Sequence, residues 1–269
     1  MPGTSKPYTT IYRHKALVRV SHWVNALVMT VMVMSGLQIF NAHPALYWGK
    51  TSTFDRPFIA LTAEMGPGGT PKGVTTIAGA QFTTTGVLGY SNGSVRGFPA
   101  WATLPGPRWL AMGRRWHFFF AWAFVINGLI FTAYSLWSRH VQKDLLPTKG
   151  ELKTLPRVAA EHARLHFPKG EEARHYNVIQ KLTYLVVLFG LGPLVVLTGL
   201  TMSPTLDTAF PFLLDIFGGR QSARTIHFLC AFGFVTFFLV HIILVLISGV
   251  GNNLRSMITG RYRIETEAR

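Results

Sequence analysis

Residues 223–249 read ARTIHFLCAFGFVTFFLVHIILVLISG. This stretch is longer than the roughly 20 apolar residues that an α-helix needs to cross a hydrocarbon core of about 30 Å. His227 and His241 lie 14 residues apart in it. In an α-helix, 14 residues advance the chain by about 21 Å and turn it by about 40° less than four full turns. Both imidazoles therefore face one side of a predicted membrane span, one near each surface.

The composition of the whole chain also indicates a membrane protein. Hydrophobic residues make up 49% of the 269 residues and charged residues only 14%, whereas soluble domains are about a quarter charged. Four stretches are long and apolar enough to be spans: about Ala16–Phe40, Arg115–Trp137, Val178–Met202 and Ala223–Gly249. The first has too long an apolar core for a cleavable signal peptide. We predict an all-α integral membrane fold, a four-transmembrane-helix bundle that residues 1–269 form as a single domain.

The positive charges lie mostly between the apolar stretches. A net charge of +15 in a soluble chain would suggest a nucleic-acid partner. Here 16 Lys and Arg residues lie on the side of the two termini and nine on the other side, which predicts that both termini are cytoplasmic. Cys230 is the only cysteine, so an internal disulfide and a Cys-based zinc or iron–sulfur site are excluded.

A long segment, about Asn41 to Gly113, separates the first two spans on the outer side. Its middle, about Thr62 to Gly97, is rich in Gly and Thr and shows little periodicity. Its end, Phe98 to Trp109, carries Pro and Trp, and Trp is enriched at the level of the lipid headgroups. Two interpretations stay open. The segment is either a poorly ordered connector or a docking surface, since a loop of this length is uncommon without a role.

Four of the ten histidines fall inside the predicted spans: His22, His117, His227 and His241. A single one could be a satisfied hydrogen bond between helices. With the N-terminus inside, the first span places His22 near the inner face. The second and fourth spans enter from outside, so His117 and His227 lie near the outer face and His241 lies deeper. The predicted couples are therefore His22 with His241 and His117 with His227.

Paired imidazoles at two depths predict two haems. Neutral imidazole is a common axial ligand of haem iron, and two such ligands leave no position for oxygen or substrate. A zinc or copper site would instead gather its ligands at one depth. No C-x-x-C-H sequence is present, so the haems would be held by coordination and not by thioether bonds. The predicted chemistry is electron transfer.

Cations near the histidines are candidates to bind the anionic haem propionates. Arg114 and Arg115 lie shortly before the histidine of the second span, and Arg19 and Arg224 each precede a histidine by three residues, on the same helix face. The alternative is that these are interface residues whose side chains snorkel to the membrane surface. Gly36 could admit the edge of a haem, although Gly is also frequent in membrane helices.

Several short motifs resemble a known family. They are Arg19-Val-Ser-His22-Trp23, Trp116-His117, the His227-x13-His241 spacing and Met257-Ile-Thr-Gly-Arg261. Together they resemble the bacterial cytochrome b561 superfamily, and within it the b-type subunits of nickel–iron hydrogenases and formate dehydrogenases. The stretch Asn41-Ala-His-Pro-Ala-Leu-Tyr-Trp-Gly49 is similar to the branch of thiosulfate reductase cytochrome b subunits. The outer segment is longer than in hydrogenase-type subunits.

The resemblance implies the same four haem ligands and a quinone site beside the inner haem. In such proteins that site is built near the inner ligand and the start of the third span, which here means His241 with Asn177, Gln180 and Lys181. The alternative is that these polar groups cap the start of the helix.

The resulting expectation is a di-haem cytochrome b subunit of a respiratory chain. It would transfer electrons across the membrane between the quinone pool and a periplasmic oxidoreductase, for which a molybdenum enzyme is the candidate. One alternative is a stand-alone superoxide:quinone oxidoreductase of the same fold. A second, without haem, is a small transporter with intramembrane histidines.

Overall fold

The computed structural model describes residues 8–164 and 176–265. The chain divides into two compact units, each composed of segments that are distant in sequence. Unit 1 comprises Met1–Asn25, Ile126–Gly192 and Phe234–Arg269, and unit 2 comprises Ala26–Val125 and Pro193–Gly233.

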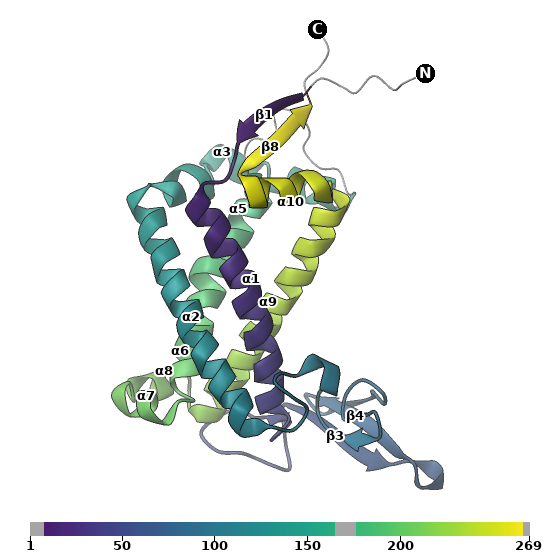
Figure 1. Ribbon diagram of the computed structural model, residues 1–269. Helices are drawn as coiled ribbons and strands as arrows, with labels where there is room; N and C mark the ends of the chain where they lie inside the picture. The colour runs from purple at the N-terminus through teal and green to yellow at the C-terminus, as the bar shows by residue number, and fades with distance from the viewer. Residues whose placement is uncertain (1–7, 165–175, 266–269) are drawn as a thin grey trace, which may run out of the picture. The chain divides into compact units, whose positions relative to one another are not determined.

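Four helical stretches are long and apolar enough to cross a membrane (Figure 1). They are α1 (Ala16–Phe40), α2 (Leu110–Trp137), Val178–Leu200, and α9 (Arg220–Ile247). The third consists of α5 (Val178–Leu185), a π-helical turn η5 (Val186–Leu191) and α6 (Gly192–Leu200). Large apolar side chains on these helices are exposed, as expected for a lipid-facing surface. The prediction of four apolar helices able to cross a membrane is confirmed, and their ends differ from the predicted ends by at most five residues.

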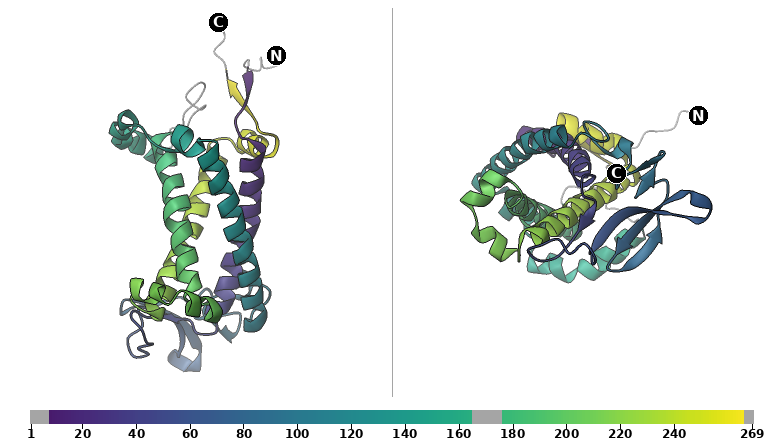
Figure 2. Two further views of the ribbon diagram at one scale, coloured as in Figure 1. Left: turned by 90° about the vertical axis from the view of Figure 1, so that its left-hand side faces the viewer. Right: turned by 90° about the horizontal axis from the view of Figure 1, so that it is seen from below.

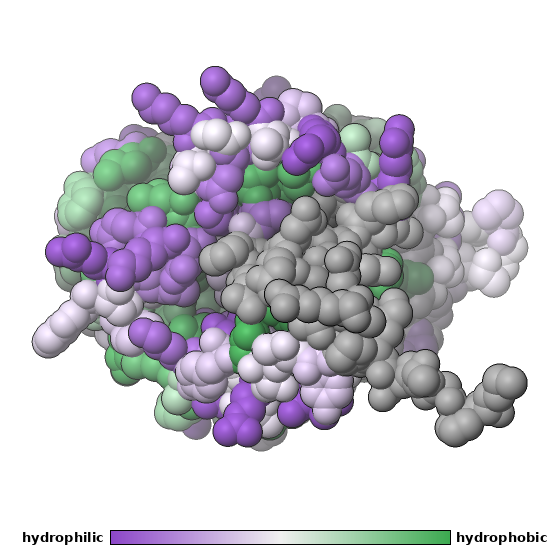
Figure 3. Space-filling view, turned by 90° about the horizontal axis from the view of Figure 1, so that it is seen from above, coloured by the Kyte–Doolittle hydropathy of each residue, from purple (hydrophilic) through white to green (hydrophobic). Residues whose placement is uncertain are grey.

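In unit 1, the two ends of the described chain form a strand pair. β1 (Tyr8–Tyr12) pairs antiparallel with β8 (Arg261–Glu265), next to α10 (Val250–Thr259). Gly260 joins α10 to β8 with a φ of 81°, and a Cβ there would lie 2.8 Å from the His14 carbonyl oxygen. Besides its parts of the spans, unit 1 contains the π-helix η3 (Val141–Leu145), α3 (Lys149–Lys153) and α4 (Leu155–Ala163). Hydrophilic side chains gather at this end of the unit (Figure 3).

In unit 2, the segment between the first two spans folds mainly as antiparallel sheet. A four-stranded sheet has the order β2-β3-β4-β5, and β6 pairs with β7. The strands are β2 (Ala45–Leu46), β3 (Ile59–Met65), β4 (Pro71–Ile77), β5 (Ala80–Thr83), β6 (Tyr90–Ser91) and β7 (Ser94–Val95). Short helices complete the unit: η1 (Pro67–Gly69), η2 (Ala100–Ala102), α7 (Pro204–Ala209) and α8 (Phe212–Ile216). The β3–β4 hairpin extends away from the helices of unit 2 (Figures 1 and 2).

The expectation of an all-α fold therefore holds for the spans but not for residues 45–95, which also rules out a structureless connector there. The strands were not predicted from the sequence because buried positions such as Thr75 and Ser91 are polar. The alternation of apolar and polar residues that indicates a strand is therefore weak. The tight turn between β4 and β5 has positive φ at Ala78 (49°) and Gly79 (87°), as type I′ hairpin turns require. Ala at the first of these positions is an unusual turn signal.

A small apolar core joins the end of α1 to the sheet. Phe40, Leu46, Leu61 and Phe98 are buried together. Next to them, the Asn41 amide group accepts from the Phe98 backbone N–H at 2.7 Å and donates to the Phe98 carbonyl at 3.0 Å. This bidentate contact satisfies a buried backbone donor and acceptor where the chain leaves the sheet.

Candidate functional site

The structure brings His117 of α2 and His227 of α9 together in unit 2. Their ring centres are 6.2 Å apart and the ring planes are inclined by 63°. His117 Nδ1–H donates to the Met32 carbonyl of α1 at 3.1 Å, and His227 Nδ1–H donates to the Val195 carbonyl of α6 at 3.0 Å. Because a carbonyl oxygen only accepts, Nδ1 carries the ring proton in both residues. The lone pair on each Nε2 is therefore left for a metal.

A second couple lies in unit 1. The ring centres of His22 on α1 and His241 on α9 are also 6.2 Å apart, with planes inclined by 59°. Phe237 stacks on the His241 ring at 5.8 Å. Trp23 meets the His22 ring edge-on at 5.2 Å, and its Nε1–H donates to the Met257 carbonyl of α10 at 3.0 Å. The continuous helix α9 thus carries one member of each couple.

The separation within each couple fits one iron ion between two imidazoles. A metal–imidazole bond is about 2 Å long and the bonding nitrogen lies about 1.2 Å from its ring centre, so opposed imidazoles on one ion have centres about 6.4 Å apart. Among the described residues, no group of three or more His, Cys, Asp or Glu side chains could hold a metal ion. Because each couple supplies two imidazoles, it suits a metal that brings its other ligands with it, as haem iron does.

The four candidate propionate ligands differ in how much of their donor capacity is used. Arg224 donates to the carbonyls of His43 at 2.6 Å and Ala45 at 2.8 Å, so both terminal nitrogens bind the backbone of unit 2. Arg19 Nη1 donates to a carbonyl of α10, while its buried Nε has no hydrogen-bond partner in the described part of the chain. An unpartnered buried cationic N–H near His22 fits an anionic ligand group.

Arg114 and Arg115 have exposed side chains on the first turns of α2. The Arg114 guanidinium lies 5.8 Å from the centre of the Phe118 ring. At these two positions the structure is also compatible with snorkelling toward a membrane surface.

The start of α9 holds the segment that follows α1. The Gly49 N–H donates to Ser222 Oγ at 2.7 Å, and Thr225 Oγ donates to the Tyr47 carbonyl at 2.6 Å. With the two bonds from Arg224, residues 43–49 are tied to the helix that carries His227. Residues 43–49 of the sequence motif Asn41–Gly49 therefore form a strap that is bonded through its backbone to the first turns of α9.

A cavity of about 300 Å³ lies in unit 1, close to the side chains preceding α1. Its lining includes Arg13, His14, Tyr134, Ser138, His140, Lys143, Asp144, Glu151, Tyr176 and Lys181. Lys181 is buried and its ammonium binds Glu151 Oε1 at 2.7 Å, which lowers the pKa of that carboxyl. His140 Nδ1 lies 2.6 Å from Asp144 Oδ2. The cavity thus combines titratable side chains with aromatic rings.

Of the three predicted quinone residues, only Lys181 lines this cavity. Asn177 and Gln180 form a capping box at the start of α5: Asn177 Oδ1 accepts from the Gln180 N–H at 2.9 Å, and Gln180 Oε1 accepts from the Asn177 N–H at 3.2 Å. This is the helix-cap alternative that the sequence left open.

Residues 13–260 match the family of prokaryotic cytochrome b561. The chain belongs to the prokaryotic cytochrome b561 family. Family membership implies haem b, and the resemblance noted in the sequence is confirmed. A relative from Azospira oryzae, provisionally named protein-methionine-sulfoxide reductase subunit YedZ1, is 25% identical over 247 residues, which cover 92% of this chain and 96% of the relative. No solved structure matches the chain. Its family and its four apolar helices together make this cytochrome b561 a multi-pass membrane protein that uses haem b.

Sequence reasoning missed the polar groups around the imidazoles of unit 2. Ser35 Oγ lies 3.1 Å from His117 Nδ1, and Thr198 Oγ lies 3.2 Å from His227 Nδ1. The signal in the sequence is weak, because it consists only of a Ser-Gly and a Thr-Gly dipeptide inside two apolar helices. Gly36, predicted to admit a haem edge, in fact lies against the His117 ring, where a Cβ would be 3.3 Å from Cε1.

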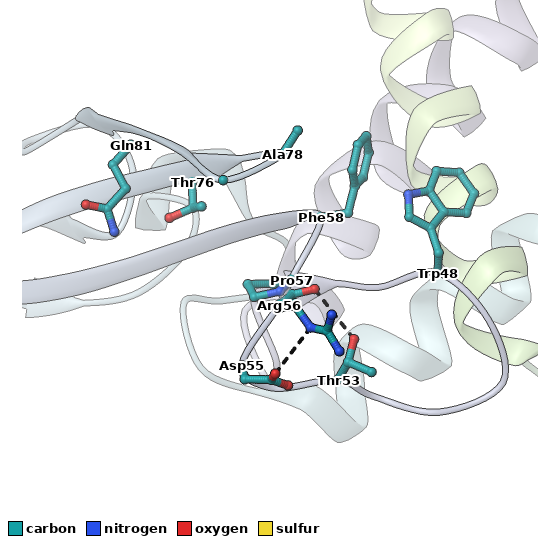
Figure 4. A pocket seen from close by; sticks show the side chains of 10 residues that line it. Trp48, Thr53, Asp55, Arg56, Pro57, Phe58, Thr76, Ala78 and Gln81 are labelled. Carbon is teal, nitrogen blue, oxygen red and sulfur yellow. Dashed lines mark hydrogen bonds and ion pairs between the residues drawn. The ribbon is translucent and has the colours of Figure 1, made fainter.

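A second hollow, of about 700 Å³, opens on the sheet of unit 2 and has no matching prediction (Figure 4). Trp48 and Phe58 form its aromatic side, with ring centres 5.3 Å apart. Arg56 and Asp55 pair at 3.3 Å on its rim, but both side chains are largely exposed. An exposed ion pair contributes little to stability and is weak support for a binding site. We therefore assign no ligand to this hollow of the cytochrome b561.

Proposed function

We propose that this chain is a di-haem b-type cytochrome that carries electrons across the membrane between a quinone pool and a periplasmic oxidoreductase. The observation that carries the proposal is the pair of matched histidine couples, each with ring centres 6.2 Å apart. One couple would support a single redox centre, whereas two couples on one continuous helix provide the two centres that a path across the bilayer requires.

The residues of the chain have distinct tasks in this proposal. His22 and His241 would hold one haem, and His117 and His227 the other. Each haem, when bound, would accept and release one electron. Because each couple would supply two imidazoles to its haem, the chain would leave no position on the iron for oxygen or substrate. Arg19 would bind a propionate in unit 1, since its buried Nε lacks a partner among the described residues.

The orientation follows from charge. The terminal segments and the segment between the second and third spans carry the excess of Lys and Arg, which supports a cytoplasmic location for both termini in a bacterial inner membrane. The hydrophilic end of unit 1, with its strand pair, α3 and α10, would then face the cytoplasm (Figure 3). The couple His22–His241 would be the inner one and His117–His227 the outer one.

The cavity of unit 1 is the place we propose for quinone. Oxidation of a hydroquinone releases protons, and the His140–Asp144 pair can accept one at His140 Nε2, because His140 Nδ1 is already bonded to Asp144. The buried Lys181 ammonium, held by Glu151, can donate to a quinone oxygen. Asn177 and Gln180 would act indirectly, since their capping box fixes the start of the helix that carries Lys181.

On the other side of the membrane, the strapped segment 43–49 and the sheet of unit 2 would receive the partner. The relative from Azospira oryzae is named as a subunit of a protein-methionine-sulfoxide reductase, which supports an oxidoreductase as the partner. We retain a molybdenum enzyme as the proposed class.

Substitution of one ligand from each couple tests the proposal. Haem is counted by the pyridine haemochrome assay, and reduction by quinol is followed optically. Wild type is expected to hold two haems per chain, and His241→Ala and His117→Ala one each. His241→Ala should abolish reduction by quinol, while His117→Ala should leave inner-haem reduction intact and stop delivery to the partner.

A histidine outside the spans provides the matched control, and His43→Ala is expected to keep both haems. Two haems at full occupancy in either ligand variant would overturn the assignment of that ligand. Superoxide-dependent quinone reduction by the chain purified alone would instead favour the stand-alone oxidoreductase.

A further inference from the structure

The imidazole of His117 lies against a compact polar arrangement on α1. The ring Nδ1 is 3.1 Å from the Met32 carbonyl oxygen and 3.1 Å from Ser35 Oγ. The Ser35 hydroxyl itself donates to the Met32 carbonyl at 3.2 Å. The next residue is Gly36, where a Cβ would come within 3.3 Å of the ring Cε1.

The imidazole of His227 lies against the same arrangement on α6. Its Nδ1 is 3.0 Å from the Val195 carbonyl oxygen and 3.2 Å from Thr198 Oγ. The Thr198 hydroxyl donates to carbonyls of its own helix, that of Val195 among them at 3.2 Å. Gly199 follows, and a Cβ there would lie 3.4 Å from the ring Cε1.

We call each arrangement a cradle: a carbonyl at position i, a hydroxyl at i+3 and a glycine at i+4. These positions share one helix face, so a single helix supplies all three groups to one ring. Two helices that are unrelated in sequence supply the same groups at the same spacing, which points to a shared requirement of the two imidazoles. An incidental contact would not be expected to recur with matching distances.

The chemistry of the cradle explains the requirement. Ser35 and Thr198 are fully buried, and each hydroxyl proton is donated to a helix carbonyl, so a hydroxyl lone pair is available to the ring N–H. Acceptors at Nδ1 fix the tautomer and the rotation of a metal-binding imidazole and increase its basicity. The glycine allows the ring to approach and leaves it little freedom to turn.

The other couple is held differently. The buried Nδ1 of His22 has no hydrogen-bond partner in the described part of the chain. An imidazole without an acceptor at Nδ1 is a weaker electron donor to iron. The two couples therefore have the same distance between ring centres. They differ because the His22 ring lacks the hydrogen-bond acceptors at Nδ1 that both rings of the unit 2 couple have.

From these contacts we infer that Ser35 and Thr198 are positioning residues that set the orientation and donor strength of the outer imidazoles, and thereby keep the potential of the outer haem below that of the inner one. This inference rests on the proposed di-haem function. Both residues would act on the haem through the ring N–H that their hydroxyl groups contact.

The test uses the full-length chain with Ser35→Ala, Thr198→Val and the double variant. Redox titration and electron paramagnetic resonance resolve the two haems, and the haemochrome assay counts them. Removal of a hydroxyl should raise the potential of the outer haem, shift its resonance signal and weaken its retention about tenfold. The inner haem serves as the internal reference and should not change. Ser35→Thr and Thr198→Ser should restore wild-type values.

Thr201→Ala is the matched control, because Thr201 is also buried and its hydroxyl donates to the Thr198 carbonyl without an interaction with the ring. An unchanged outer potential and signal in the double variant would overturn the inference, as would an equal effect of Thr201→Ala. A wild type with fewer than two haems would instead refute the proposed function.

Discussion

His14 shows how a single residue near the proposed quinone cavity responds to its surroundings. Burial, followed by the nearby Arg13 guanidinium, lowers the pKa of His14 from 6.5 to about 4. His22, His140 and Arg19 also contribute in the same direction. His14 is therefore neutral at physiological pH, and its imidazole can accept hydrogen bonds at the edge of the cavity that it lines.

The lowered pKa of His14 predicts how the stability of the protein depends on pH. Between pH 4 and 6.5 the unfolded chain binds a proton at His14 that the folded chain does not. The free energy of unfolding is therefore unaffected by His14 above pH 6.5 and decreases as the pH falls from 6.5 toward 4. His14→Gln should remove about 1–2 kcal/mol of this pH dependence, after allowance for solvent screening. Unfolding in detergent at pH 7 and pH 4.5 measures it. Lys15→Gln serves as control, and an identical pH slope in His14→Gln would contradict the prediction.

At the scale of elements, different parts of α9 have different roles. Its first turns hold the strap at residues 43–49 through Ser222, Arg224 and Thr225, and its interior carries two of the four histidines. Arg224 was predicted as a propionate ligand, yet both of its terminal nitrogens donate to the strap. The position of Arg224 three residues before His227 therefore did not reveal that its guanidinium binds the strap.

Arg224→Met should loosen the strap. The two charge-assisted bonds to the carbonyls of His43 and Ala45 would be lost, at a cost of about 1–3 kcal/mol in local stability. Hydrogen exchange at residues 45–49 should accelerate accordingly, while both haems remain bound. Arg220→Met is the control, since Arg220 pairs with Asp207 and not with the strap. Unchanged protection in Arg224→Met would show that Ser222 and Thr225 hold the segment alone.

At the scale of the whole molecule, the sequence predicted what depends on local pattern. The apolar stretches identified all four spans, and helical rise with charge asymmetry predicted which histidines would meet. The π-helical turn Val186–Leu191 inside the third span ends two residues before Pro193, which has no N–H to donate to the carbonyl four residues earlier. This proline is a sequence signal that the prediction of the third span did not use. The cradles could not be foreseen because they require knowing that α1 lies against His117 and α6 against His227. Such contacts are properties of packing between distant segments.

The sheet of unit 2 is the part of the molecule that the helical prediction did not contain, and a precise truncation tests whether it receives the partner. β3 and β4 pair in register with Ala63 opposite Gly73, so residues 64–72 can be replaced by Asn-Gly, which favours a type I′ turn. The buried Leu61 and Val74 stay in place. We expect both haems to remain and co-purification of the oxidoreductase to fall about tenfold or more, as when a central interface contact is lost. Lys72→Gln, which alters only charge at the removed tip, is the matched control. Undiminished co-purification would show that the tip of the hairpin does not receive the partner, and docking would then involve the strap or the remainder of the sheet, which the truncation leaves intact.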